Sequence, residues 1–218
     1  MGWPGLWAAA QCVGPEASVR SAVGSSLLLF RYATVALASY EWSGPSHQLV
    51  LLPWTEIRSE EILDDVLLTL TNATRREASP GTALGVAMRR GAEFLAERTD
   101  CAKLTLDISG DGKSNMGQRP AQAIADIRGR DLTIYGLVIG ADAPDLGDLR
   151  QAEIAELSAY FRANVIMGED AFVETALGFE EFAAAMARKL ERELRVFIYS
   201  ELDEVAAPDI PSDASPDQ

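Results

Sequence analysis

The chain has 218 residues, of which 48% are hydrophobic and 24% charged, and its net charge is −14. This length and balance predict one globular domain with extensions, large enough to bury a core of its own. The excess of acidic residues argues against proteins that bind nucleic acids or anionic membranes. No apolar run approaches the roughly 20 residues of a membrane-spanning helix, so we expect no membrane span.

Both ends of the chain differ in composition from the middle. Residues 1–25 are dominated by Gly, Pro, Ala and Ser and keep no period of 2 or 3.6, so we expect an irregular segment, disordered or foreign to the domain. It is a poor signal peptide, because its first basic residue, Arg20, follows the apolar stretch. Residues 198–218 are acidic and rich in proline, which predicts a disordered tail. The folded domain is therefore expected over residues 26–197.

The first regular part of the domain is a predicted hairpin. Tyr32–Trp42 and His47–Trp54 are rich in β-branched, aromatic and aliphatic residues and are separated by four turn residues. A connection this short suits antiparallel strands and cannot hold a crossover. Pro53 lacks an N–H group for the sheet, so we expect the second strand to lie at an edge.

After the hairpin, predicted helices alternate with predicted strands. The last helix has its basic residues, Lys189 among them, near its C-terminus, where the helix dipole favours cations. Alternation of this kind predicts an α/β fold: a three-layer α/β/α sandwich with a mostly parallel sheet and one antiparallel edge hairpin. One predicted helix begins near Ser59, and a second, after a loop, ends near Arg98. Three further helices are predicted over Arg119–Arg130, Asp148–Ala163 and Phe179–Val196. The predicted strands after the hairpin span Lys103–Ser109, Leu132–Ile139 and Ala171–Ala176.

Few residues are available for histidine or cysteine chemistry. His47 is the only histidine, which leaves little room for a Ser-His-Asp or Cys-His arrangement and none for a multi-histidine metal site. Cys12 and Cys101 are the only cysteines. Two cysteines do not form a framework, so we expect two small thiols, with a disulfide as the alternative.

The loop after the strand Lys103–Ser109 is the candidate functional site, because ligands of α/β sheets bind at the carboxyl ends of the strands. Its Gly112-Lys113-Ser114 ends like a phosphate-binding loop, but the leading position is Asp107, whose carboxylate would repel phosphate. A Mg²⁺-dependent phosphohydrolase using Asp107 and Asp111 is a second interpretation. A third is a non-catalytic site for Mg²⁺ or another hard divalent cation, formed by Thr82 and Asp111. A simple turn at Asp111-Gly112 remains the alternative to any metal site.

Several strings occur in the order seen in one bacterial family. The hairpin VALASYEWSGPSHQLVLLPW, the loop SPGTALGVAM and the strand and loop LTLDISGDGKSN resemble domain of unknown function 1194 (DUF1194), a relative of the von Willebrand factor type A domain. The resemblance covers roughly Tyr32–Glu193. It implies a metal-ion-dependent adhesion site, in which the first strand supplies D-x-S-x-S, a second loop Thr and a third loop Asp. Thr82 matches the second loop and Asp111 the third, with Ser109 and Asp107 as further candidate ligands.

The chain departs from this pattern before the hairpin. Its first aspartate is Asp64, so the D-x-S-x-S motif is absent, and the central first strand of the family is absent with it. Val23–Phe30 is a partial substitute for that strand; an altered gene start is the other explanation. We therefore expect a non-catalytic protein-interaction module with an incomplete, weak divalent-cation site. The alternatives are the Asp107/Asp111 phosphohydrolase and a truncated chain without independent function.

The resemblance also implies how such a module works and where it is found. In type A domains the metal keeps an open position that an acidic group of a protein partner completes, so the outcome is binding and not turnover. The sequence does not identify that partner. Relatives of the family look exported or periplasmic, whereas this chain carries no convincing signal peptide, so its compartment stays open.

Overall fold

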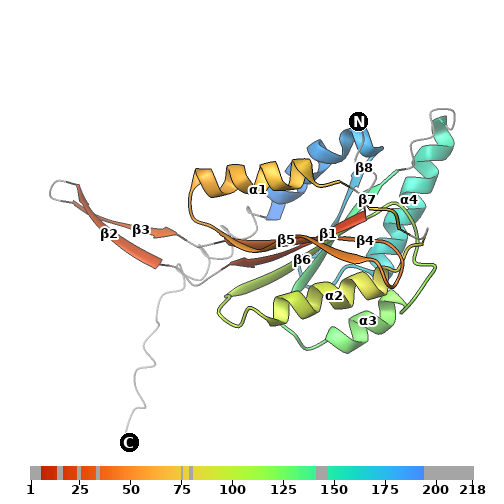
Figure 1. Ribbon diagram of the computed structural model, residues 1–218, viewed down its shortest axis with the longest axis horizontal. Helices are drawn as coiled ribbons and strands as arrows, with labels where there is room; N and C mark the ends of the chain where they lie inside the picture. The colour runs from red at the N-terminus through yellow and green to blue at the C-terminus, as the bar shows by residue number, and fades with distance from the viewer. Residues whose placement is uncertain are drawn as a thin grey trace, which may run out of the picture.

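The computed structural model describes residues 6–13, 17–23, 26–32, 35–74, 76–78, 81–140 and 147–193. The predicted acidic tail, residues 198–218, lies outside these ranges. Within them the chain is a three-layer α/β/α sandwich, as the sequence predicts (Figure 1).

The middle layer is a six-stranded sheet in the order β5-β4-β1-β6-β7-β8. Four strands, β4, β6, β7 and β8, run in one direction, and β1 and β5 run against them. The predicted hairpin is confirmed as β4 and β5, with β5 at the edge, and the predicted parallel pair is confirmed as β6 and β7. The strands are β1 (Leu6–Val13), β4 (Val35–Trp42), β5 (Gln48–Ile57), β6 (Lys103–Gly110), β7 (Thr133–Ile139) and β8 (Val173–Ala176).

Strand β1 is the main difference from the sequence-based expectation. Residues 6–13, expected to be irregular, form the strand between β4 and β6 and pair antiparallel with both. Ala10, for example, lies opposite Ala38 on one side and Leu106 on the other. Interior strands must have both rows of backbone polar groups hydrogen-bonded, and β1 meets this requirement at the centre of the sheet. The small side chains of Ala8 and Ala10 are fully buried there.

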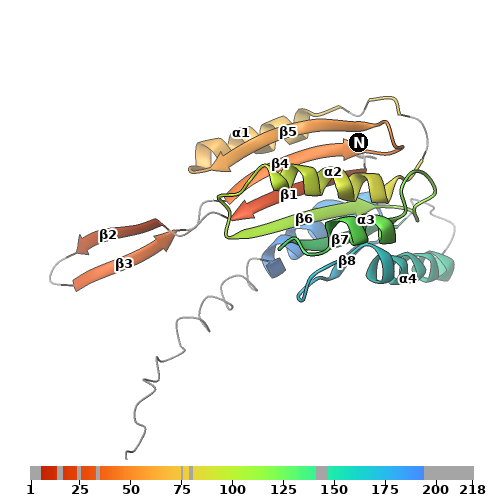
Figure 2. The same cartoon turned by 90° about the horizontal axis from the view of Figure 1, so that it is seen from below.

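A second, separate sheet consists of two strands, β2 (Ala17–Val23) and β3 (Ser26–Tyr32). They pair antiparallel with each other, and the hairpin projects from the six-stranded sheet (Figure 2). The prediction that Val23–Phe30 substitutes for the central strand is therefore wrong, since β1 takes that place. Residues 26–32 find their hydrogen-bond partners in β2 instead.

The helices cover both faces of the sheet (Figures 1 and 2). One face carries α2, α3 and α4; the other carries α1 and a helix over residues 182–193, drawn in blue in Figure 1. None of the described helices has the length and apolar character needed to cross a bilayer. The bounds are α1 (Glu60–Asn72), α2 (Leu84–Ala96), α3 (Pro120–Ile127), α4 (Gly147–Asn164) and a 3-10 turn (Phe179–Glu181).

The main core lies between the sheet and the α2–α4 layer. Alternate residues of β6, such as Leu106 and Ile108, face this layer and are fully buried. The buried Tyr40 donates its hydroxyl to the carbonyl of Ala87 in α2, at 2.6 Å. A Cβ at Gly91 would lie only 2.2 Å from a methyl group of Leu106, so any larger residue at this position of α2 would force the Leu106 side chain to move.

Cys12 and Cys101 form a disulfide, with their Cα atoms 5.5 Å apart. The expectation of two separate thiols is therefore wrong. The pairing of β1 with β6 sets Cys12 opposite Leu104, three residues after Cys101, and so brings the two sulfurs together. The bond closes a loop across 89 residues and ties the central strand to the turn that precedes β6.

We predict that removing this disulfide destabilises the domain by about 2–4 kcal/mol, because the unfolded chain regains the freedom of a long loop. Urea unfolding of the oxidised protein, the reduced protein and the variant Cys12→Ala/Cys101→Ala measures the difference. Thiol titration of the unfolded, unreduced protein should detect no free thiol. Two titratable thiols per chain would contradict the bond.

Candidate functional site

The candidate site is a cleft at the carboxyl ends of β6 and β7. Its volume is about 210 Å³, and it lies between the loop after β6 and the first turns of α4. Three carboxylates line it, those of Asp111, Glu153 and Glu156. Lys113 forms an ion pair with Glu156 at 2.5 Å, and this hydrogen bond lowers the pKa of the Glu156 carboxyl. The balance of charge around the cleft is negative, which attracts cations.

Thr82 lies beside this cleft because its loop is hydrogen-bonded to the loop after β6. The Thr82 N–H donates to the side-chain oxygen of Asn115 at 2.9 Å, and the Asn115 N–H donates back to the Thr82 carbonyl at 3.0 Å. A Cβ at Gly112 would lie 3.4 Å from the Thr82 hydroxyl. The hydroxyl of Thr82 therefore faces the residue that follows the exposed Asp111.

Asp107 and Ser109 lie elsewhere. Both are buried within β6, two residues apart, and their side chains are on the face of the sheet that points away from the α2–α4 layer. The carboxylate of Asp107 forms an ion pair with Lys189, which comes from the helix over residues 182–193, and accepts a hydrogen bond from Gln11 of β1. Of the four candidate metal ligands, Asp111 lines the cleft and the hydroxyl of Thr82 lies next to the cleft residue Gly112, whereas Asp107 and Ser109 are buried within β6.

The ion pair belongs to a buried polar cluster, which we define as Gln11, Asp107, Lys189 and Glu193. Lys189 also pairs with Glu193, one helical turn further along, and its ammonium group lies 5.1 Å from the centre of the Tyr135 ring. Two carboxylates thus share one ammonium group in the interior. Burial, and then the charge of Asp107, raise the pKa of Glu193 to about 7. The only sign of this cluster in the sequence is the spacing of four residues between Lys189 and Glu193, which places them on one side of a helix.

The arrangement of Asp107 bears on the hydrolase alternative. That mechanism requires Asp107 and Asp111 to share a metal ion. Asp107 is instead neutralised by Lys189 inside the sandwich, while Asp111 is exposed at the sheet edge. The alternative therefore lacks its second carboxylate.

The only histidine has a structural role. The His47 Nε2 atom lies 2.6 Å from a carboxylate oxygen of the buried Glu41. The pair joins the two strands of the β4–β5 hairpin next to its turn, where the Ser43 N–H also donates to the His47 carbonyl at 3.2 Å. His47 is thus bound to Glu41 and not to a residue of the cleft.

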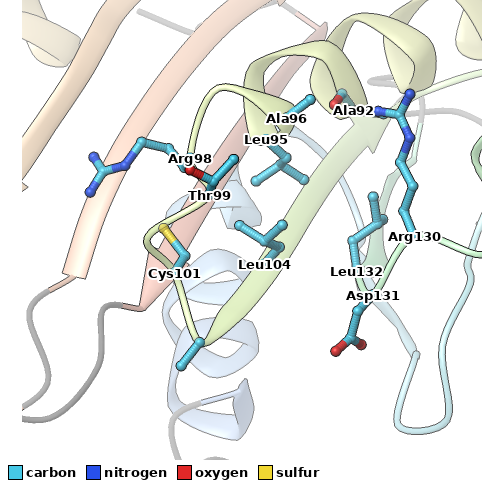
Figure 3. Close-up of a pocket in the computed structure, with 11 residues that line it drawn as sticks. Ala92, Leu95, Ala96, Arg98, Thr99, Cys101, Leu104, Arg130, Asp131 and Leu132 are labelled. Atoms are coloured by element: carbon cyan, nitrogen blue, oxygen red, sulfur yellow. Dashed lines mark hydrogen bonds between the residues drawn. The ribbon is translucent and has the colours of Figure 1, made fainter.

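A larger cavity, about 270 Å³, lies at the opposite edge of the sheet (Figure 3). Leu95, Leu104 and Leu132 line it, and Arg130 donates to the carbonyl of Ala92 at 3.0 Å. It sits at the amino ends of β6 and β7, whereas ligands of α/β sheets bind at the carboxyl ends. We therefore assign the candidate site to the smaller cleft.

One group of side chains in the described residues has the spacing of a metal site: Cys12, Asp100 and Cys101. Both sulfurs are bound to each other in the disulfide, so they have no thiolate to offer a cation. This group does not support a divalent-cation site.

Comparison with known proteins gives one match. The sequence profile of the family described as Protein of unknown function (DUF1194) matches residues 10–197, which include β1, the cleft and the buried polar cluster. The chain belongs to this family. The resemblance to DUF1194 that the hairpin and loop sequences indicated is thereby confirmed. No curated protein and no solved structure shows significant similarity to the chain.

We predict that Lys189→Met destabilises the domain by about 3–5 kcal/mol at pH 8, because it leaves the carboxylates of Asp107 and Glu193 buried without a cation. The matched control is Lys113→Met, which removes an exposed lysine from its pair with Glu156 and should cost no more than about 1 kcal/mol. Urea unfolding followed by tryptophan fluorescence measures both. Equal losses in the two variants would show that Lys189 is not buried in an ion pair.

We predict that the contribution of Glu193 to the stability of the domain falls as the pH rises from about 4.5 to 7. Glu193 keeps its proton in the folded protein up to a pKa of about 7, against an ordinary value of 4.5, so the folded state binds more protons in this window. Glu193→Gln should remove this dependence and stabilise the domain at pH 8 by roughly 1–2 kcal/mol. Glu191→Gln, an exposed position on the same helix, is the control and should leave the pH profile unchanged.

Proposed function

We propose that this protein is a non-catalytic protein-interaction module of the von Willebrand factor A type, with an incomplete metal-ion-dependent adhesion site at Thr82 and Asp111. The observation that carries the proposal is the hydrogen-bonded approach of the Thr82 loop to the loop after β6, at the carboxyl edge of the sheet. This is the place where α/β sheets bind ligands. A hydroxyl and a carboxylate are the hard oxygen donors that Mg²⁺ and Mn²⁺ prefer.

The donor set supports a weak site. Two protein oxygens leave four of the six positions around Mg²⁺ to water or to a partner. Strand β1 runs against β6, so the end of β1 at this edge is its amino end, where Leu6 pairs with Trp42. An acidic group of a protein partner is the natural additional ligand of such an open cation.

The compartment is part of this proposal. Disulfides persist in oxidising compartments and are rare in the cytosol. The Cys12–Cys101 bond therefore supports a protein that works outside the reducing cytosol, such as a periplasmic or secreted protein. Localisation by fractionation, with the bond assayed in the recovered protein, tests this assignment.

The cation site is tested by adding Mn²⁺ to ¹⁵N-labelled protein and measuring the broadening of amide signals. We expect the signals of residues 111–115 to broaden with an affinity no tighter than millimolar, about 4 kcal/mol of binding free energy. Asp111→Ala and Thr82→Ala should abolish the effect. Asp131→Ala, an exposed aspartate at the opposite edge of the sheet, is the control and should leave it unchanged.

Three results would contradict the proposal. Micromolar affinity lost in Asp111→Ala would show a complete adhesion site and not an incomplete one. Broadening that is equal around Asp111 and Asp131 would show that the cation has no specific site at the cleft. Turnover of a phosphate ester, lost in Asp111→Ala, would restore the hydrolase alternative.

A further inference from the structure

The helices on the second face of the sheet leave an apolar groove between them. It has a volume of about 510 Å³ and lies between α1 and the helix over residues 182–193, above β4 and β5. Its walls are almost wholly apolar, and its floor includes Ser39 of β4. We name it the α1 groove; its principal apolar residues are Leu51, Leu67, Leu70, Phe182, Met186 and Leu190.

The apolar stripe of α1 is only partly covered. Val66 is the one residue of this helix that is buried, while Leu63 and Leu67 are 44% and 53% exposed. On the opposite wall of the groove, Leu190 is 38% exposed. Leu63 and Leu67 lie one helical turn apart on α1, and Leu70 follows on the same side of the helix, so these residues form an apolar strip, of which Leu67 and Leu70 line the groove. Strips of this kind mark interaction sites.

The floor of the groove contains one buried hydroxyl, that of Ser39. Ser39 is 1% exposed, and its hydroxyl has no hydrogen-bond partner among the described residues. Leaving a buried hydroxyl unpaired costs free energy, about 1–3 kcal/mol.

The rim of the groove is acidic. Glu60 and Asp64 precede Leu63 and Leu67 by three residues, so they border the leucine strip on the surface of α1. The helix α1 contains four acidic residues and no basic one. On the opposite wall, Glu191 follows the groove residue Ala187 by one turn. The basic Arg188 is bound to Glu174, at 2.9 Å.

We propose that the α1 groove binds a basic amphipathic helix of another protein. The apolar face of that helix would cover the leucine strip, and its lysine or arginine side chains would pair with Glu60, Asp64 and Glu191. Docking of an amphipathic helix into an apolar groove is a recurring mode of recognition, and complementary charge sets its specificity. The 13 residues of α1 correspond to roughly 20 Å, which an occupant of about 12–14 helical residues would match. The groove lies apart from the cation cleft and shares no residue with it.

The proposal is tested with a fluorescently labelled 14-residue peptide made of leucine and lysine, with leucine at helical positions i, i+3, i+4 and i+7. A second peptide has the same composition but alternates leucine and lysine, so it cannot form one apolar helical face. Fluorescence anisotropy with the full chain measures both affinities. We expect the helical peptide to bind at least tenfold tighter than the alternating one.

Paired variants locate the binding surface. Leu67→Ala should weaken binding of the helical peptide at least fivefold, as expected for a central apolar contact. Leu177→Ala is the matched control, since Leu177 is similarly exposed, at 46%, but lies outside the groove. Glu60→Lys/Asp64→Lys should weaken binding about tenfold at 50 mM salt and much less at 500 mM, because salt screens the charges. Circular dichroism confirms that each variant is folded.

Three outcomes would overturn the proposal. Equal affinity for the two peptides would mean that charge alone drives binding. Equal effects of Leu67→Ala and Leu177→Ala would place the peptide outside the groove. A dimer seen by analytical ultracentrifugation and lost in Leu67→Ala would assign the groove to a second copy of this chain. Failure of any of these tests leaves the cation cleft unaffected, because Mn²⁺ binding reports on that site alone.

Discussion

The six-stranded sheet depends on the strand that lies between β4 and β6, because this strand must form hydrogen bonds along both of its edges. These two strands run in the same direction, and without a strand between them the centre of the sheet would expose unpaired backbone groups to the core. Strand β1 fills the position while running against both neighbours. Successive side chains of β1 point to opposite faces of the sheet. Ala8 and Ala10 face α2, where small residues suit close packing, and Gln11 faces the opposite layer.

The buried polar cluster follows from this alternation. Gln11 donates to Asp107, and Lys189 reaches the same carboxylate from the helix over residues 182–193. Buried ion pairs are weak evidence for stability, because desolvation offsets much of their attraction. Their geometry is nevertheless demanding, since a shift of the helix by one turn would separate Lys189 from Asp107 and leave both charges buried. The cluster therefore fixes the register of the helix at its C-terminal end, and this register also sets the wall of the α1 groove.

Sequence patterns predicted the elements whose composition or periodicity reflects burial. The hairpin was recognisable from its β-branched and aromatic residues around a short turn, β7 from its continuous apolar run, and α4 from apolar residues at helical spacing. Strand β1 was not, since its alanines have little strand preference and its pairing depends on distant residues. The disulfide was missed with it, because Cys12 meets Cys101 only once β1 is in place. Lys189 looked like an exposed helix-end cation, because the sequence does not show which face a helix buries.

The candidate site was predictable in part for a similar reason. Carboxyl ends of neighbouring parallel strands lie at one edge of the sheet, so the sequence could place the loop after β6 beside the end of β7. The structure adds the position of Thr82, whose loop is hydrogen-bonded to Asn115 of the loop after β6. Asp107 was the misleading candidate. Its sequence neighbours suggested a cluster of metal ligands, but Asp107 lies within β6 and not in the loop that contains Asp111. Its carboxylate points to the helix over residues 182–193, where it forms an ion pair with Lys189.

The two proposed surfaces differ in the physical interaction on which each would depend. At the cleft, a bridging cation reverses the sign of the local charge, so an acidic partner becomes acceptable to a chain whose net charge is −14. At the α1 groove, the carboxylates act directly and favour a basic partner. A chelator therefore acts on the first surface only. Moderate salt acts mainly on the second, where exposed charges are screened while the leucine contacts remain. Because the helix over residues 182–193 forms one wall of the groove and is held by the buried polar cluster, a change that separates Lys189 from Asp107 should disturb the groove and leave the Thr82–Asn115 hydrogen bonds intact.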